Sequence, residues 1–291
     1  MVAPEQSRPW LIAAAVTPLA DGGSRIDEAA VAPMVEFLQA RGVDGVLACG
    51  TTGEGILLEP DERRKVSEAF RQAVTGRLIV HCGAQTTAQT VALAAHAAGI
   101  GADGVAVIAP PYYRFDEQSL TAHFVAAARA CAPTPFYCYA FAARSGYPLT
   151  VDTVRRIKES IDNLAGMKVS EQPWEAVAPY LSVGVPVLVG NEPVIPQALP
   201  AGAAGSVSGL AAALPEVVRA ALDDPTGPAG ERLERVRAVL EDGGQFVATA
   251  KHVLGMRGLP VRPDVRAPLR RLNPAEVAAI ESSAELRQVI G

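Results

Sequence analysis

Lysine is scarce in this chain of 291 residues. Only Lys65, Lys158, Lys168 and Lys251 are lysines, and the rest of the 26 basic residues are arginines. Chemistry that requires a primary amine therefore has four candidate side chains. The 31 acidic residues give a formal net charge of −5. Because the arginines are scattered, the sequence lacks the concentrated basic face that nucleic-acid binding requires.

The sequence also lacks an apolar run of the roughly 18–20 residues that a membrane-spanning helix needs. The apolar segment 10–20 is interrupted by Pro18, and Arg8 is the one basic residue before it. Both features indicate a buried strand rather than a signal peptide. The four cysteines lie in apolar runs without the paired spacing of a metal site. We therefore expect a cytoplasmic protein with no metal site and no membrane partner.

Short apolar runs alternate with longer amphipathic segments along most of the chain. Most of these runs show no alternation of polar and apolar residues, which is typical of strands buried on both faces of a parallel sheet. The expected strands are Leu11–Leu19, Val43–Gly50, Leu78–Ala84, Gly104–Pro110, Thr134–Ala140, Leu164–Ser170, Pro186–Gly190 and Gly205–Gly209. Eight strand–helix units predict an α/β fold of the (β/α)8 (TIM) barrel type.

The strand pattern disappears after about residue 223, where Pro225-Thr226-Gly227-Pro228 indicates a linker. The remainder predicts three helices, at 229–240, 246–256 and 274–290. We expect residues 1–223 to form the barrel and residues 224–291 to form a C-terminal helical extension.

Catalytic residues of such barrels lie at the C-terminal ends of the strands. Lys168 closes the sixth run among apolar residues, whereas the other three lysines lie in stretches that look polar and helical. Burial disfavours the charged ammonium and favours an amine that forms a Schiff base with a carbonyl substrate. The alternative is a structural lysine paired with a carboxylate.

Tyr139 closes the fifth run, on the strand that precedes the lysine strand, and a phenol there is suited to proton transfer. A packing role is the alternative. The segment Gly50-Thr51-Thr52-Gly53-Glu54 closes the second run; its glycines, backbone N–H groups and hydroxyls suit a carboxylate, or form an ordinary turn. Arg144 follows the fifth run and is suited to a second carboxylate, or is a surface arginine.

Together these motifs resemble the dihydrodipicolinate synthase/N-acetylneuraminate lyase family from Leu11 to about Leu272. The GTTGE segment, Pro110-Pro111-Tyr112-Tyr113 and Tyr139 followed by Arg144-Ser145-Gly146 contribute to the resemblance. Gly166-Met167-Lys168 and the late Lys251–Gly255 complete it.

The resemblance implies that Lys168 forms an imine with pyruvate or another 2-oxo acid, without a cofactor. Tyr139, Thr51 and Tyr113 then match a proton relay, in which Tyr113 reaches into a neighbouring subunit. The residues that match substrate-binding positions are Thr52, Gly50, Arg144, Val207 and Gly190. The resemblance further implies a homo-oligomer, either a tetramer or a dimer.

Three segments depart from the family pattern, namely Ala140-Phe141-Ala142, Val169-Ser170-Glu171 and Gly190-Asn191-Glu192. We expect them to shape the site of the second substrate, an aldehyde. Arg144 favours the condensation of pyruvate with aspartate semialdehyde. The alternatives are another aldolase or dehydratase for sugar acids, hydroxy-oxo acids or sialic acids, and a non-catalytic sensor of 2-oxo acids or amino acids.

Overall fold

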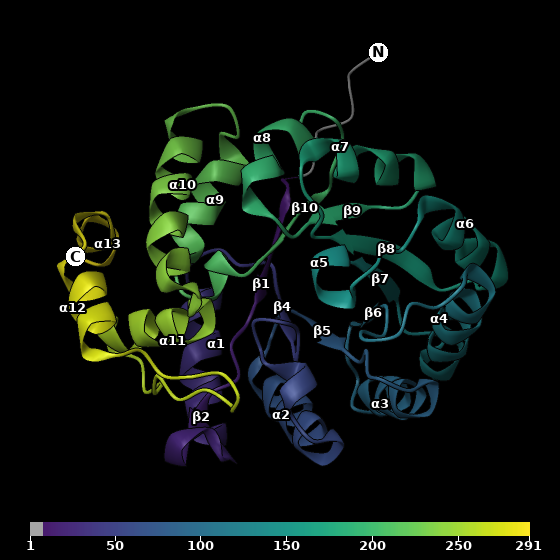
Figure 1. The fold of residues 1–291 in the computed structure, drawn as a ribbon, viewed down its shortest axis with the longest axis horizontal. Coiled ribbons are helices and arrows are strands. Elements are labelled where there is room, and N and C mark those ends of the chain that lie inside the picture. The colour runs from purple at the N-terminus through teal and green to yellow at the C-terminus, as the bar shows by residue number, and fades with distance from the viewer. Residues whose placement is uncertain (1–7) are drawn as a thin grey trace.

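The computed structural model describes residues 8–291, in which eight parallel strands close into a barrel (Figure 1). Around the barrel the strands follow the order β1-β10-β9-β8-β7-β6-β5-β4. Their bounds are β1 (Trp10–Ala14), β4 (Gly45–Ala48), β5 (Arg77–His81), β6 (Gly104–Ile108), β7 (Phe136–Ala140), β8 (Leu164–Val169), β9 (Val187–Val189) and β10 (Gly205–Ser208). The predicted (β/α)8 barrel is confirmed.

The strands carry apolar residues on both faces because both faces are buried. An inner cluster that includes Ile12, Leu47, Ile79 and Leu188 fills the barrel. The alternate residues pack outward against the helices in a larger cluster. This two-sided burial explains the near-continuous apolar runs of the sequence.

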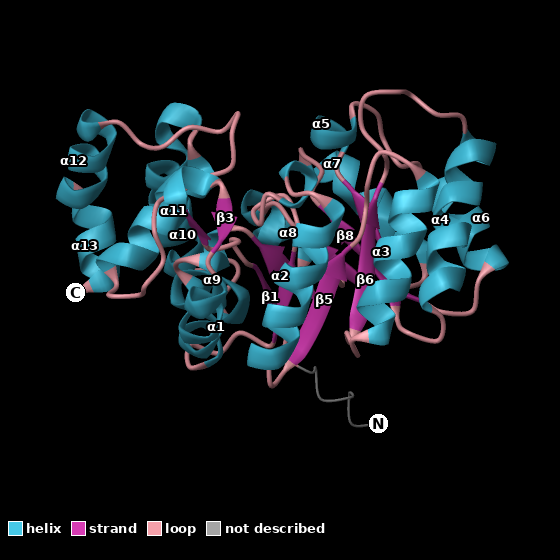
Figure 2. Ribbon diagram, turned by 90° about the horizontal axis from the view of Figure 1, so that it is seen from below, coloured by secondary structure: helices cyan, strands magenta, loops and turns pink. Residues whose placement is uncertain are grey.

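Helices surround the strands (Figure 2). The barrel helices are α1 (Val31–Gln39), α2 (Pro60–Ala73), α3 (Thr87–Gly99), α4 (Glu117–Cys131), α5 (Ala142–Ser145), α6 (Val151–Ser160), α7 (Trp174–Val177), α8 (Ile195–Ala198) and α9 (Pro215–Asp223). The start of α2 illustrates how sequence sets a helix end, because Pro60 follows a capping box formed by Glu59 and Glu62. None of the helices in residues 8–291 is long and apolar enough to span a membrane.

Four further helices lie on one side of the barrel, where α10 packs against α9 (Figure 1). They are α10 (Pro228–Glu241), α11 (Phe246–Met256), α12 (Pro274–Ser282) and α13 (Ala284–Ile290). The single helix predicted for residues 274–290 is wrong. Ser283 has φ −59° and ψ 120° between the two helices, and its side chain accepts a hydrogen bond from the Leu286 N–H at the start of α13.

The first predicted strand is also too long. β1 ends at Ala14, and Leu19–Ala20 forms a separate strand, β2, that pairs antiparallel with β3 (Arg25–Ile26). The apolar run continues because Ala15, Val16 and Leu19 stay buried outside the barrel sheet. Because these residues are as apolar as those of β1, the composition of the sequence does not change where β1 ends.

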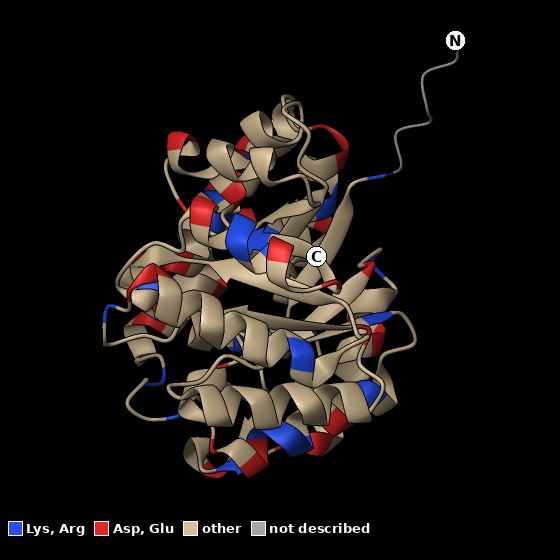
Figure 3. Cartoon of the chain, turned by 90° about the vertical axis from the view of Figure 1, so that its right-hand side faces the viewer, with Lys and Arg blue, Asp and Glu red and all other residues tan. Residues whose placement is uncertain are grey.

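Acidic and basic residues are intermixed along the outer helices (Figure 3). Many of them form exposed ion pairs such as Arg64–Asp61 and Arg155–Asp152. Exposed pairs contribute little to stability, about 0–1 kcal/mol each. These pairs therefore contribute little to the stability of the fold.

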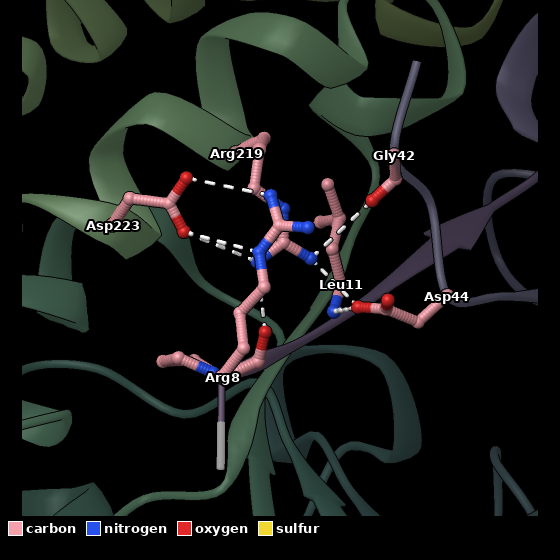
Figure 4. A network of polar contacts seen from close by, with 7 residues as sticks. Arg8, Leu11, Gly42, Asp44, Arg219 and Asp223 are labelled. Carbon is pink, nitrogen blue, oxygen red and sulfur yellow. Dashed lines mark hydrogen bonds and ion pairs between the residues drawn. The ribbon is translucent and has the colours of Figure 1, made fainter. Parts of the chain in front are cut away.

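A partly buried polar network joins β1, β4 and α9 at the N-terminal end of the barrel (Figure 4). The Arg219 guanidinium lies 2.6 Å from the Asp44 carboxylate, which also accepts a hydrogen bond from the Leu11 N–H at 2.7 Å. Asp223 lies 3.4 Å from both Arg219 and Arg8. The network links the first barrel strand to the last barrel helix.

Candidate active site

Lys168 lies on β8 with its side chain inside the barrel. Its neighbours Met167 and Val169 pack outward, so the alternation of the strand turns Lys168 inward. The residue is 6% exposed, and its Nζ lies 4.4 Å from the centroid of the Tyr139 ring. Within residues 8–291 this Nζ has no hydrogen-bond or ion-pair partner. A buried amine without a carboxylate partner is available for nucleophilic chemistry.

Tyr139 lies beside Lys168 because the two residues are in register on the paired strands β7 and β8. Tyr139 also faces inward, and its Oη lies 3.4 Å from Oγ1 of Thr51, which extends from the turn after β4. Tyr137, two residues earlier, belongs to the apolar cluster inside the barrel. The geometry therefore brings together an amine, a phenol and a hydroxyl from three strand ends.

The turn that carries Thr51 and Thr52 has a constrained backbone. Cys49 and Glu54, at its two ends, have φ values of 56° and 57°, a region that side chains other than glycine rarely adopt. A Cβ on Gly55 would lie 1.8 Å from the Cys49 carbonyl oxygen, so only glycine fits there. Thr52 is buried, and its Oγ1 lies 3.2 Å from where a Cβ on Gly209 would stand.

The carboxylate of Glu54 fixes this turn to the C-terminal extension. Lys251 on α11 is fully buried and donates to Glu54 Oε1 at 2.5 Å and to the Asp264 carbonyl at 2.6 Å. The Arg266 N–H donates to Glu54 Oε2 at 2.6 Å. The prediction that Lys251, like Lys65 and Lys158, lies in a polar helical stretch was wrong, because the face of α11 that carries Lys251 is buried. The apolar run 246–256 around Lys251 was the signal for it.

Gly190 leaves room beside the lysine. A Cβ at this position would lie 2.8 Å from Lys168 Cε and 2.0 Å from Ser170 Oγ. This Ser170 Oγ is buried and has no hydrogen-bond partner within residues 8–291. Val207 lies in the apolar cluster inside the barrel. Sequence reasoning did not single out Ser170 as a polar group beside the amine.

Arg144 lies on the short helix α5 and is exposed. Its guanidinium lies 5.5 Å from the Phe141 ring centroid, and Phe141 in turn lies 6.0 Å from the Tyr139 ring. Glu171 accepts a hydrogen bond from the Ala142 N–H at 2.8 Å, and burial raises the pKa of this carboxyl. Two of the three departing segments, at residues 140–142 and 169–171, therefore meet at α5.

The last residue of the third departing segment, Glu192, does not follow the expectation. Glu192 is turned into the protein, where its Oε1 accepts hydrogen bonds from Ser208 Oγ at 2.5 Å and from the Leu210 N–H at 3.3 Å. It connects the loop after β9 to the end of β10 instead of facing open space. Its contacts are structural, and sequence reasoning had no means to identify Ser208 as the partner.

Tyr113 is not brought to the other site residues. It is 68% exposed, and its ring packs against Tyr112 and Phe115, with centroids at 4.9 Å and 6.5 Å. Tyr112 has φ 83°, an unusual conformation for a tyrosine. Residues 8–291 contain no cluster of three or more His, Cys, Asp or Glu side chains arranged to hold a metal.

Known proteins resemble this chain over most of its length. The model of the dihydrodipicolinate synthetase family matches residues 9–286. An uncharacterized DapA-like lyase of Halobacterium salinarum is 36% identical over 275 residues, covering 90% of this chain and 88% of the relative. A 4-hydroxy-tetrahydrodipicolinate synthase of Methanothrix thermoacetophila is 33% identical over 277 residues, covering 91% and 92%.

A solved structure of Proteus mirabilis N-acetylneuraminate lyase superposes with a TM-score of 0.88 at 26% identity, covering 97% of this chain and 98% of that one. The family model spans the barrel and the helices α10–α12 and ends within α13. The chain therefore belongs to the dihydrodipicolinate synthase/N-acetylneuraminate lyase family and is an enzyme of the class I, Schiff-base-forming lyase type.

Proposed function

We propose that the enzyme condenses pyruvate with aspartate semialdehyde, the dihydrodipicolinate synthase reaction. The observation that carries the proposal is the unpaired Lys168 amine, 4.4 Å from the ring of Tyr139. The Methanothrix relative, named for this type of synthase, supports it. Residue roles follow from the chemistry that each group can perform.

Lys168 Nζ attacks the 2-oxo carbon of pyruvate, and loss of water from the carbinolamine leaves a protonated imine. The imine withdraws electrons from the neighbouring methyl group, which loses a proton to become an enamine. The enamine carbon attacks the aldehyde to form the new C–C bond, and hydrolysis of the imine frees Lys168. Tyr139 and Thr51, with oxygens 3.4 Å apart, pass the protons of these steps.

The turn after β4 is proposed to bind the carboxylate of pyruvate. The Thr52 hydroxyl and the N–H groups that follow Gly50 are suited to an anion. Gly190 and Val207 would border the same space. Arg144 is exposed beside Phe141, and we assign it to the carboxylate of aspartate semialdehyde.

Tyr113 is proposed to complete the relay of a second copy of the chain. Its 68% exposure supports this role, because a large aromatic side chain is costly to leave in water. The assembly would then be a dimer or tetramer. Analytical ultracentrifugation tests it; a monomer at working concentrations would remove Tyr113 from the relay.

Borohydride reduction in the presence of pyruvate, followed by intact mass and peptide mapping, tests the chemistry. We expect one reduced pyruvate per chain, attached to Lys168. An unmodified chain would contradict the assignment of the imine to Lys168 and, with it, the proposed reaction. Lys158, which donates to two backbone carbonyls at the surface, is the control lysine.

A coupled assay tests the second substrate. Replacement of Arg144 by leucine is expected to raise KM for aspartate semialdehyde about 10- to 100-fold, because a charge-assisted hydrogen bond is lost. KM for pyruvate should hardly change. Arg155→Leu, on the exposed face of α6, is the matched control.

One observation favours a second candidate, a lyase for 2-keto-3-deoxy sugar acids. The Ser170 hydroxyl beside Lys168 has no hydrogen-bond partner within residues 8–291, and a buried polar group of this kind is free to bond to a group that enters the site. A hydroxylated substrate would satisfy it. Cleavage of such a sugar acid, without turnover of aspartate semialdehyde, would replace the first candidate.

A further inference from the structure

His81 is a buried base to which the proposed mechanism gives no role. It ends β5, and its side chain faces inward because Val80 and Cys82 pack outward. Its Nδ1 lies 3.1 Å from the Cys49 carbonyl oxygen. Since a carbonyl oxygen only accepts, Nδ1 carries the proton. Nε2 is then an acceptor, and it has no partner in the part of the chain that the structure describes.

The imidazole contacts both sides of the Thr51–Tyr139 pair. Its ring packs edge-to-face against Tyr139, with centroids 6.0 Å apart and planes at 87°. Its hydrogen bond holds Cys49, whose left-handed backbone begins the turn that carries Thr51. The His81 side chain thus connects the end of β7, which carries Tyr139, to the turn that carries Thr51.

The position of His81 is itself restrained. Arg63, buried on α2, donates to the carbonyl oxygens of His81 at 2.7 Å and Gly83 at 2.9 Å. A Cβ on Gly83 would lie 2.9 Å from His81 Nε2, so glycine provides the space for the ring. The His81 backbone is bonded to Arg63, its Nδ1 is bonded to Cys49 and its ring packs against Tyr139. The imidazole therefore has little freedom to move.

The ring is also neutral. Burial, together with the nearby cations Arg63 and Lys168, lowers the pKa of His81 to about 3. A neutral ring adds no positive charge beside the Lys168 amine. Its contribution is therefore shape and one hydrogen bond.

We propose that His81 is a positioning residue that holds the Tyr139 phenol and the Thr51 hydroxyl within reach of each other during proton transfer. The proposal rests on the proposed function, because it assumes that these two groups carry protons to and from the Lys168 adduct. Movement of a reacting group by about 1 Å can cost about 100-fold in rate.

Exchange of the pyruvate methyl protons for deuterium, followed by NMR in D2O, measures this proton transfer without the second substrate. We expect His81→Ala to slow exchange about 10- to 100-fold. Borohydride trapping at saturating pyruvate should still label Lys168 fully, because the amine itself is unchanged. Thermal melting identifies any variant that fails to fold.

Two further variants separate the two contacts of His81. His81→Asn retains a donor near the Nδ1 position and loses the ring, whereas His81→Phe retains a ring and loses the donor. Each is expected to slow the exchange of the pyruvate methyl protons less than His81→Ala does. If all three exchange within about twofold of the parent protein, His81 has no positioning role.

A double variant with Tyr139→Phe distinguishes a positioning role of His81, which acts through Tyr139, from a merely structural role. If His81 acts through Tyr139, His81→Ala should slow exchange little further on the Tyr139→Phe background. Independent, multiplying losses would overturn the proposal. A parent protein that neither exchanges pyruvate protons nor forms an adduct would instead overturn the proposed function, and this proposal with it.

Discussion

The two buried lysines occupy opposite environments. Lys251, at 0% exposure, has a carboxylate and a carbonyl oxygen as partners. Lys168, at 6%, lies against an aromatic ring and has no polar partner within residues 8–291. Burial lowers the pKa of Lys251 while Glu54 opposes that effect. Burial therefore does not distinguish a reactive lysine from a structural one, but its partners do.

Lys168→Met tests the reactive side of this comparison. We expect at least about a 10⁴-fold loss of turnover, because no other group can form the imine. Stability should be unchanged or higher, since the variant removes an unpaired buried amine. Turnover and urea denaturation measure the two effects. A large loss of stability would show that Lys168 has a structural role after all.

Lys251→Met tests the structural side. Glu54 would stay buried without its cation, so we expect the free energy of unfolding to fall by about 3–5 kcal/mol. Protein that remains folded should still form the Lys168 adduct. The matched double variant Glu54→Gln/Lys251→Met, in which the charge is removed, should recover much of the loss. A double variant as unstable as the single one would contradict this account.

Two buried histidines, His81 and His123, are further basic groups that have no carboxylate partner within residues 8–291. Burial lowers the pKa of His81 to about 3 and that of His123 to about 4, from 6.5. Between pH 6.5 and about 4 the unfolded chain therefore binds more protons than the folded one, and stability falls as pH falls. Chemical denaturation across that range measures the slope, and His123→Asn should reduce it. If the free energy of unfolding instead rose as pH fell, His81 and His123 would not be neutral in the folded protein.

The fold was predictable because two-sided burial leaves apolar runs that a sequence displays. The rule that chemistry lies at strand ends also selected Lys168 and Tyr139, which the barrel register places side by side. Roles for these residues stay predictions until the adduct is measured. The division at residues 223 and 224 also stays a prediction, which the end of α9 at Asp223 supports.

Other features depended on contacts between distant segments. Lys251 meets Glu54 across 197 positions, and Glu192 finds Ser208 on another strand end. No local pattern encodes either pair. His81 ends a predicted strand and so met the positional rule, but its value depends on the ring of Tyr139 and the carbonyl of Cys49.

The polar network of Figure 4 has a consequence for biosynthesis. Its Arg219 and Asp44 come from segments 175 positions apart. A ribosome makes the N-terminal strand first, at about 5–20 residues per second, so β1 waits roughly 10–40 s for β10 with one edge unpaired. Until β10 and α9 emerge, that edge is open to pairing with other chains. Chaperone dependence of this enzyme should therefore be concentrated in the interval before residue 219 is synthesised.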